Sequence, residues 1–169
     1  MFFKKKCPDC GTNNPRGAAT CASCGAPFEQ RQVERPEALK DYDEAIFLSH
    51  QSAEAYYKRG FAYQKLGQNE SAIEDFDKAI SINPQFAKAY SNRAYAYLSK
   101  GQYDRTIIDC NKAFRLDPGD AVVCLNRGVA HKLQGNTAEA IADFEKAITL
   151  SENPQLIKQA QQQIKELSR

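Results

Sequence analysis

The sequence predicts an all-α solenoid of stacked helical hairpins, preceded by a small cysteine-rich head. The main observation is a pattern of apolar and small residues that repeats every 34 residues from position 53 to position 154. A second observation is that four of the six cysteines lie, as two pairs, in the first 24 residues. The third is that no stretch approaches the ~20 apolar residues that a membrane-spanning helix needs.

Composition indicates the compartment and excludes some partners. The net charge of +2 is too balanced for a general attraction to nucleic acid or to an anionic membrane. The first residues, MFFK, place their charge after their apolar side chains and are too short for a secretory signal. We therefore expect a cytoplasmic protein, because in a reducing compartment paired cysteines bind metal more often than they form disulfides.

The head, residues 1–28, is predicted to hold one structural Zn²⁺ ion. Two residues separate Cys7 from Cys10, ten separate Cys10 from Cys21, and two separate Cys21 from Cys24. Two such pairs can present four sulfurs at the ~2.3 Å that tetrahedral zinc requires. Because four thiolates fill the shell, no position remains for a catalytic water.

A redox function of the two cysteine pairs is the main alternative to zinc. Disulfide exchangers place such a pair between a strand and a helix, whereas Pro8, Pro15 and Gly17 make this region loop-rich. Residues 7–28 resemble the short zinc ribbons at the ends of many bacterial proteins, in which CPxCG, a Pro-Gly loop and CxxCGAP follow in that order. The spacing also resembles small fingers that bind single-stranded RNA, but the head lacks the aromatic on which a base would stack.

After a polar linker at 29–36, residues 37–50 (EALKDYDEAIFLSH) align with only the second half of the repeating unit. Ala38, Tyr42 and Ala45 fall on its three core positions, and no first helix precedes them. We therefore predict a half repeat, with the head standing where the missing first helix would pack.

Three full units follow at 53–86, 87–120 and 121–154, each predicted to form two helices. Residues spaced four and three apart share one face of each helix. On the first helices these are Tyr56/Tyr90/Cys124, Gly60/Ala94/Gly128 and Tyr63/Tyr97/His131, and on the second they are Ala72/Thr106/Ala140, Phe76/Cys110/Phe144 and Ala79/Ala113/Ala147. Gly67, Gly101 and Gly135 fall where a left-handed residue would end the first helix.

This pattern resembles the tetratricopeptide repeat (TPR) family, with eight spaced positions that occur three times in register. The resemblance implies a superhelical solenoid with the first helices on its concave side. Departures are few: Thr106 replaces a small residue, His131 replaces an aromatic, and the last proline, Pro154, comes two residues late. Residues 155–168 carry one apolar stripe on an otherwise polar helix, and we predict that this helix caps the solenoid.

The resemblance also implies which residues face the concave groove, namely the second, fifth, ninth and twelfth of each unit. They are Glu54, Tyr57, Phe61, Gln64, Lys88, Ser91, Tyr95, Leu98, Val122, Leu125, Val129 and Lys132. Six of these are large and apolar, and such side chains on open surface typically mark a binding site. We predict partner contacts at Tyr57, Phe61, Lys88, Asn92, Tyr95, Leu98, Leu125, Asn126 and Val129. The alternatives are that these residues contact neighbouring first helices or the chain's own terminus.

One known use of the family is to clamp a C-terminal carboxylate with Lys and Asn in the first unit, Asn in the second, and Lys and Arg in the third. Asn92 matches the second-unit Asn, but Tyr57, Phe61, Val122 and Asn126 stand at the other four positions. Carboxylate recognition needs charge-assisted donors, so the sequence argues against this clamp.

Charged residues repeat with the same period, as Arg59, Arg93 and Arg127 against Asp41, Asp75, Asp109 and Asp143. Each Arg lies 18 residues after one Asp and 16 before another. We predict a ladder of partly buried Arg–Asp pairs that fixes how the units stack, with a fully solvated charged face as the alternative.

Taken together, these features predict a non-enzymatic adaptor that binds a peptide or helix of a protein partner in the concave groove. No Gly-rich phosphate loop, GxSxG or HExxH motif occurs, and Cys110 and Cys124 fall at core positions. The alternative is that the head docks on nucleic acid or its machinery while the repeats recruit a protein. That contact would use Lys4, Lys5, Lys6, Arg16, Arg31 and Arg35. The identity of the partner and the oligomeric state do not follow from the sequence.

Overall fold

The computed structural model describes residues 4–6, 13–15, 23 and 37–168. The chain divides into two compact units, Met1–Pro36 and Glu37–Arg169. In the first unit, strand β1 (Lys4–Lys6) pairs antiparallel with β2 (Asn13–Pro15), with Lys5 opposite Asn14. The four cysteines of the predicted zinc site lie outside the described residues, so that prediction stays a prediction.

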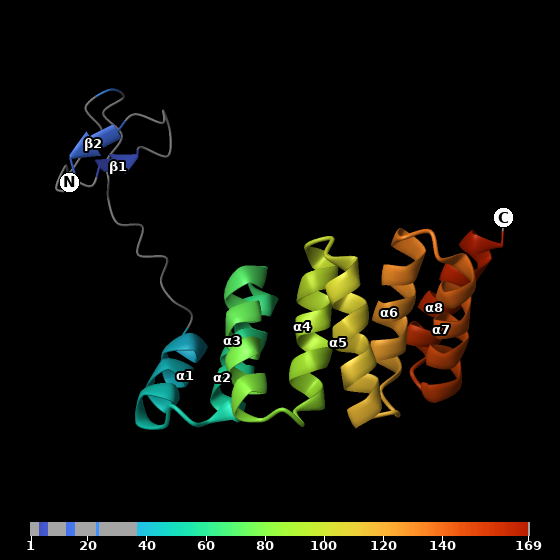
Figure 1. The fold of residues 1–169 in the computed structure, drawn as a ribbon, viewed down its shortest axis with the longest axis horizontal. Helices are drawn as coiled ribbons and strands as arrows, with labels where there is room; N and C mark the ends of the chain where they lie inside the picture. Colours follow the sequence, from blue (N-terminus) through green and yellow to red (C-terminus); the bar gives the residue numbers. More distant parts are fainter. Residues whose placement is uncertain (1–3, 7–12, 16–22, 24–36, 169) are drawn as a thin grey trace. The chain divides into compact units, whose positions relative to one another are not determined.

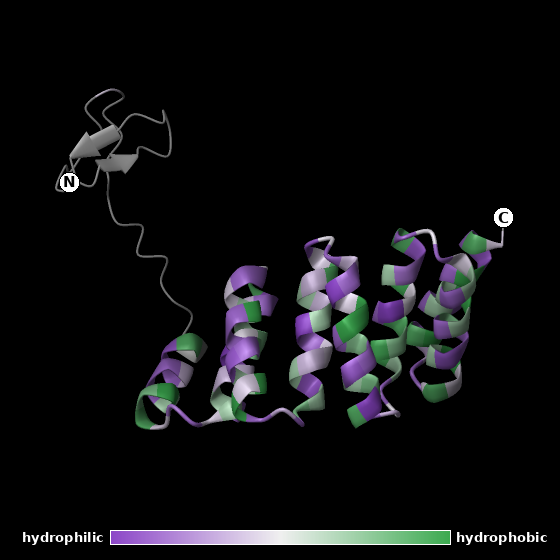
Figure 2. Cartoon of the chain, in the orientation of Figure 1, coloured by the Kyte–Doolittle hydropathy of each residue, from purple (hydrophilic) through white to green (hydrophobic). Residues whose placement is uncertain are grey.

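The second unit is a row of helices that alternate in direction (Figure 1). Their bounds are α1 Glu37–Leu48, α2 Ala53–Lys65, α3 Asn69–Ile82, α4 Ala87–Ser99, α5 Tyr103–Leu116, α6 Ala121–Leu133, α7 Thr137–Leu150 and α8 Pro154–Leu167. Helices α2/α3, α4/α5 and α6/α7 form the three predicted hairpins, and α8 packs on α7. Figure 2 shows polar and apolar residues mixed along every helix, as expected where each helix has one buried face.

Local signals in the sequence explain where the helices begin and end. Side chains of Ser52, Asp120 and Asn153 accept hydrogen bonds from the backbone amides at the starts of α2, α6 and α8. The glycines predicted to end the first helices, Gly67, Gly101 and Gly135, have φ of 72°, 72° and 83°. These left-handed values confirm the prediction, since only glycine adopts them without strain.

Each hairpin closes by matching a small residue on its first helix to a core side chain on its second. A Cβ atom added to Gly128 would lie 2.8 Å from the ring of Phe144, and one added to Gly60 would lie 2.9 Å from the ring of Phe76. The middle unit has Ala94 and the smaller Cys110 at these positions, and both are buried. The larger residue on the first helix is thus paired with the smaller residue on the second.

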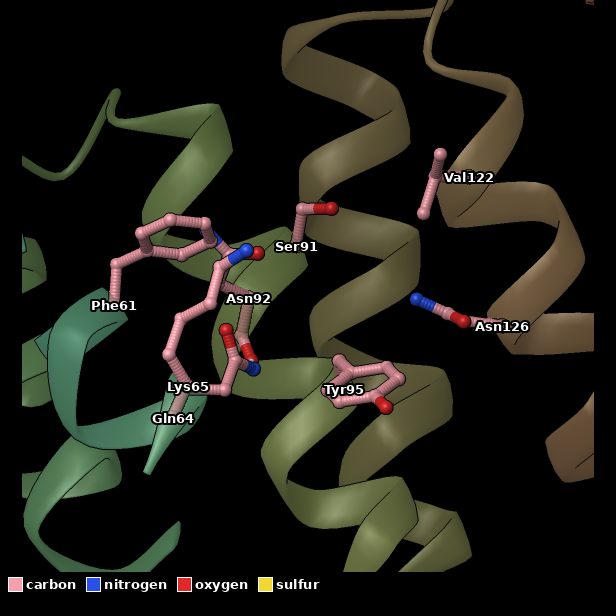
Figure 3. Close-up of a pocket in the computed structure, with 8 residues that line it drawn as sticks. All are labelled: Phe61, Gln64, Lys65, Ser91, Asn92, Tyr95, Val122 and Asn126. Carbon is pink, nitrogen blue, oxygen red and sulfur yellow. The ribbon is translucent and has the colours of Figure 1, made fainter. Parts of the chain in front are cut away.

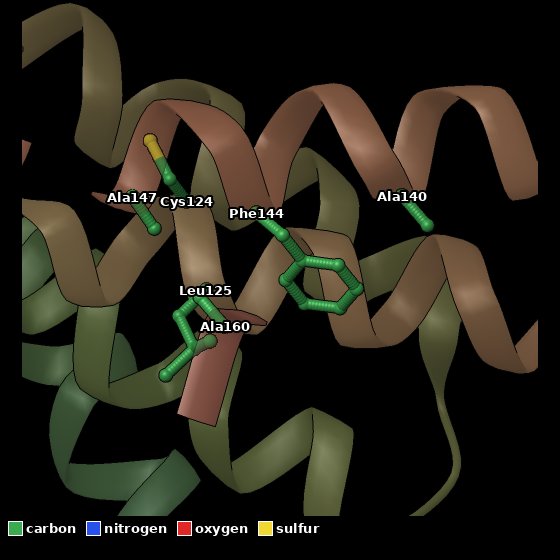
Figure 4. Close-up of a cluster of buried hydrophobic side chains, with 6 residues drawn as sticks. All are labelled: Cys124, Leu125, Ala140, Phe144, Ala147 and Ala160. Carbon is green, nitrogen blue, oxygen red and sulfur yellow. The ribbon is translucent and has the colours of Figure 1, made fainter. Parts of the chain in front are cut away.

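The capping helix α8 covers the third unit, as the sequence predicts. Cys124, Leu125, Phe144 and Ala160 belong to one buried cluster, against which Val129 also packs (Figure 4). The Nζ of Lys132 on α6 donates to the side chains of Gln163 at 2.8 Å and Glu166 at 2.7 Å on α8. Helix α8 thus takes the place that the first helix of a fourth unit would occupy.

Helix α1 differs from the prediction in length and in its buried face. It ends at Leu48 rather than at residue 50, it packs on α2, and Leu39 and Ile46 are buried among those of its side chains that the structure describes, which do not include Ala38. Tyr42 and Ala45, which align with core positions of the repeat, are only half-buried. In the described part of the chain, no helix is both long and apolar enough to cross a membrane.

Candidate functional site

A cavity of about 370 Å³ opens on the first helices of the three units (Figure 3). Each of these helices contributes because residues three and four apart project from the same side. The lining residues are Phe61, Gln64 and Lys65 of α2, Ser91, Asn92 and Tyr95 of α4, and Val122 and Asn126 of α6. Five of them, Phe61, Gln64, Ser91, Tyr95 and Val122, are at positions that the sequence analysis expects to face the groove.

Two aromatic rings on the cavity wall are open to solvent. Phe61 of α2 is 40% exposed and Tyr95 of α4 is 48% exposed. The ammonium of Lys65 lies 5.1 Å from the centre of the Phe61 ring, at cation–π distance. Lys65 is the single charged residue among those that line the cavity. The wall can therefore offer apolar and π contacts together with one positive charge.

A hydrogen-bond network fixes the floor between α2 and α4. The amide Nδ2 of Asn92 donates to the hydroxyl of Tyr57 at 3.1 Å, and Nε2 of Gln64 donates to the backbone carbonyl of Asn92 at 3.0 Å. The Tyr57 ring packs 4.8 Å from that of Phe86. Burial raises the pKa of Tyr57, so its hydroxyl stays neutral at physiological pH and can accept from Asn92.

Asn126 stands at the opposite wall with its hydrogen-bonding capacity unused. Only 7% of the residue is exposed, and its side chain makes no hydrogen bond to any other described residue. Figure 3 shows its amide pointing into the cavity toward Tyr95. The amide atoms themselves keep access to solvent, because His131 Nδ1 is the one fully buried side-chain polar atom without a hydrogen-bond partner in the described part of the chain. The amide of Asn126 can therefore offer both a donor and an acceptor to a ligand in the cavity.

The structure divides the predicted contact residues into two groups. Phe61, Asn92, Tyr95 and Asn126 line the cavity together. The other five do not: Tyr57 packs beneath it, Lys88 is exposed outside it, Leu98 is half-buried, and Leu125 and Val129 belong to or pack against the cluster with α8. Of the six apolar groove positions, Phe61 and Tyr95 are exposed, whereas Leu125 and Val129 lie in or against the cluster that includes Ala160 of α8.

Four lining residues are absent from the predicted contacts. Gln64, Ser91 and Val122 are at predicted groove-facing positions but are not among the chosen contacts. Lys65 is at none of these positions. The signal that could have found it is its place four residues after Phe61, which sets the two side chains together on a helix surface.

The predicted Arg–Asp ladder exists, with one change of partner. Within each unit the Arg donates to the Asp 16 residues later, at 2.8 and 2.6 Å for Arg59 to Asp75. Arg93–Asp109 and Arg127–Asp143 repeat this geometry. The second contact goes to the residue 16 before the Arg, not 18 before. These residues are Asp43, Asp77 and Asn111.

Helix geometry explains the change. Two positions along a helix are about 200° apart at 3.6 residues per turn. Asp75 therefore faces the first helix of its own unit, while Asp77 faces Arg93 of the next unit. Each arginine thus joins its own unit to the one before it.

Comparison with known proteins places these observations in a family. The family model described as "Tetratricopeptide repeat" matches residues 53–86, 87–120 and 121–154, and the model described as "TPR repeat" matches residues 34–67. No curated protein matches the chain.

Several solved structures are similar to this chain. A crystal structure of MamA protein is 30% identical over 68% of this chain and 62% of its own, with a TM-score of 0.62. The Arabidopsis OM64 TPR domain is 29% identical over 69% of this chain and 96% of its own, with a TM-score of 0.65. The second TPR domain of human RPAP3, solved in complex with the HSP70 peptide SGPTIEEVD, is 30% identical over 71% of this chain and 98% of its own, with a TM-score of 0.63. The repeats, their hairpin geometry and these matches agree, and the chain belongs to the tetratricopeptide repeat family.

Proposed function

We propose that this protein is a non-enzymatic adaptor that binds a short segment of a partner protein, a peptide or a helix, in the cavity between α2, α4 and α6. The observation that carries the proposal is the cavity, into which the amide of Asn126 points, without a hydrogen-bond partner among the described residues, beside two exposed aromatic rings. A ligand that hydrogen-bonds Asn126 while covering Phe61 and Tyr95 would satisfy both features.

The chemistry of the wall fits a polypeptide. An asparagine amide can donate to a backbone carbonyl and accept from a backbone N–H at the same time. Aromatic rings bury apolar side chains at low cost in conformational entropy. The human RPAP3 domain was solved with a peptide, and this supports a peptide as the ligand class here.

The expected ligand differs from that peptide in charge. Apart from Lys65, the lining residues are neutral, so the cavity lacks the set of basic donors that would hold the several carboxylates of an acidic C-terminus. We therefore propose an internal, largely uncharged segment as the ligand. The peptide SGPTIEEVD, labelled with a fluorophore, serves as the negative probe and should show no saturable binding.

The decisive experiment compares partners captured by the wild type and by a Phe61→Ala/Tyr95→Ala variant. Both side chains are exposed, so their loss should leave the fold intact. It should lower the affinity for the partner at least tenfold. The control is Ile108→Ala, which removes an exposed apolar side chain on α5, outside the cavity. Equal capture by all three proteins would overturn the proposal. A peptide from any captured protein is then titrated against Asn126→Ala.

For the head we propose that Cys7, Cys10, Cys21 and Cys24 bind one structural Zn²⁺ ion. The spacing of the cysteines supports this. Pairing of β1 with β2 brings Lys6, the residue before Cys7, opposite Asn13. A cytoplasmic location is part of the same proposal, because thiolates stay free to bind metal in a reducing compartment.

A further inference from the structure

Helix α1 presents a face that is buried in every other unit. The second helices of the three full units bury an aspartate, a large or medium core side chain and an alanine against their own first helices. These are Asp75/Asp109/Asp143, Phe76/Cys110/Phe144 and Ala79/Ala113/Ala147. The corresponding residues of α1 are Asp41, which is exposed, and Tyr42 and Ala45, which are half-buried.

The same difference continues toward the end of the helix. Leu48 is 76% exposed, whereas the matching Ile82, Leu116 and Leu150 are half-buried. Asp41, Tyr42, Ala45 and Leu48 are spaced for one side of a helix, and we name them the α1 face. Leu39 and Ile46 are on the neighbouring side of α1, which borders Tyr42, and they are buried where α1 packs on α2.

Comparison with the Arg–Asp ladder shows that, in the described part of the chain, the α1 face lacks an arginine. Asp75, Asp109 and Asp143 each accept two hydrogen bonds from the arginine of their own first helix. Asp41 occupies the matching position, and among the described residues it has no hydrogen bond or ion pair. Asp43, two residues on, is already bonded to Arg59. The ladder therefore begins with one carboxylate for which the described structure supplies no arginine.

We propose that the α1 face docks an amphipathic helix of a partner protein that carries an arginine followed directly by glycine or alanine. Helix α2 shows how such a helix would sit, because Arg59 bonds Asp75 and Gly60 lies against Phe76. In the docked helix the arginine would meet Asp41 and the small residue would lie over Tyr42. Apolar residues one turn to either side, like Tyr56 and Tyr63, would cover Ala45 and Leu48.

Two other occupants fit the face less well. One period upstream of α2, this chain has Gly25 where the arginine belongs and Pro27 inside the would-be helix, where proline removes a hydrogen bond and clashes. A second copy of the chain could offer its terminal helix α8, but α8 has Gln161 and Gln162 at the arginine and glycine positions and is packed on α7. Charge complementarity therefore favours a separate partner.

The test uses a helical peptide of residues 53–66 (AEAYYKRGFAYQKL) as the probe. A lactam between Glu54 and Lys58 holds the helix, since these side chains already form an ion pair at 3.5 Å on the side away from Arg59. Fluorescence anisotropy of the labelled peptide is measured against the full-length protein. We expect saturable binding that Asp41→Asn weakens about fivefold to tenfold, as loss of a charge-assisted hydrogen-bond pair predicts.

Two controls make the result specific. Glu44→Gln removes the same charge from an exposed position of α1 next to the face and should leave the affinity unchanged. A peptide with Arg59→Gln should bind wild type and Asp41→Asn equally weakly. The proposal is overturned if binding of the lactam peptide does not saturate, and the same result would follow if residues 1–36 cover the face. It is also overturned if Asp41→Asn and the wild type bind the peptide with equal affinity. If the wild type self-associates, and Asp41→Asn dissociates it whereas Glu44→Gln does not, the face binds a second copy of the chain instead.

Discussion

At the scale of single residues, the arginines of the ladder are the groups for which loss of the aspartate partner should lower the stability of the fold. Arg93 bonds Asp109 at 2.7 Å through both Nε and Nη2, and Asp109 is buried. Burial raises the pKa of Asp109, and the bonds from Arg93 counteract this. The pair therefore contributes little net stability compared with apolar residues, but a single member left alone would be a buried, unpaired charge.

The first prediction follows from this asymmetry. Asp109→Ala should lower the free energy of unfolding by about 3 kcal/mol, because Arg93 is left without its buried partner. Asp77→Ala should cost under about 1 kcal/mol, because Asp77 is 52% exposed. Urea denaturation followed by circular dichroism measures both.

The double variant Arg93→Leu/Asp109→Leu separates pairing from packing. Replacing both charges with apolar side chains should recover most of the stability lost in Asp109→Ala. If the two single aspartate variants cost the same, the distinction between buried and exposed partners would be refuted.

At the scale of helices, each hairpin depends on a small residue opposite a core side chain. Gly60 and Gly128 face phenylalanines, while Ala94 faces Cys110. The residue sizes on the two helices compensate for each other, because the unit with the larger residue on its first helix has the smaller one on its second. Total volume at the helix contact is thereby kept nearly constant.

The second prediction concerns Gly128→Ala. Alanine normally stabilises a helix interior by about 1 kcal/mol relative to glycine. Here the added Cβ would lie 2.8 Å from Phe144 and 3.2 Å from the backbone oxygen of Ala140, so we expect a loss of about 1–3 kcal/mol instead. Thermal unfolding of the variant tests the sign.

A double-mutant cycle tests the mechanism of that loss. Phe144→Cys should cost less in the Gly128→Ala background than in the wild type, because the pair then matches Ala94 and Cys110 of the middle unit. Additive effects of the two changes would contradict a steric origin.

The helices also show how far the sequence could predict the structure. The three hairpins, the left-handed glycines and the capping helix follow from spacing, because period and turn chemistry act locally. The solvent exposure of Leu125 and Val129 does not follow from spacing, because it depends on how α8 packs beside α6. That no described residue hydrogen-bonds the Asn126 side chain could not be predicted from the sequence either, since it depends on side-chain directions from two neighbouring helices.

At the scale of the whole molecule, the cysteines report on both units. Cys110 and Cys124 are buried free thiols, and burial raises the pKa of both, which makes the reactive thiolate scarce in the folded protein. The remaining four cysteines are those that we propose to bind zinc. The two groups should therefore become reactive under different conditions.

The third prediction is a stepwise thiol titration with Ellman's reagent. The native zinc-loaded protein should show almost no fast thiols, a chelator should release four, and denaturant should bring the total to six. Circular dichroism after chelation should retain most of the helical signal, because the helices from α2 onward contact one another and bury side chains such as Phe76, Cys110 and Phe144. Four fast thiols before chelation would refute the zinc site, and complete loss of helix would make the head part of the solenoid core.

The position of α8 determines how long a ligand can be and which way it extends. Three helix axes about 10 Å apart give a free inner surface of roughly 20 Å across α2, α4 and α6, a footprint of about six residues of extended chain at ~3.3 Å each. Beyond α6 the way is obstructed, since Lys132 is tied to Gln163 and Glu166. A longer ligand would therefore have to extend past α2, so that among the described helices only α8 limits the bound stretch, and it does so at one end.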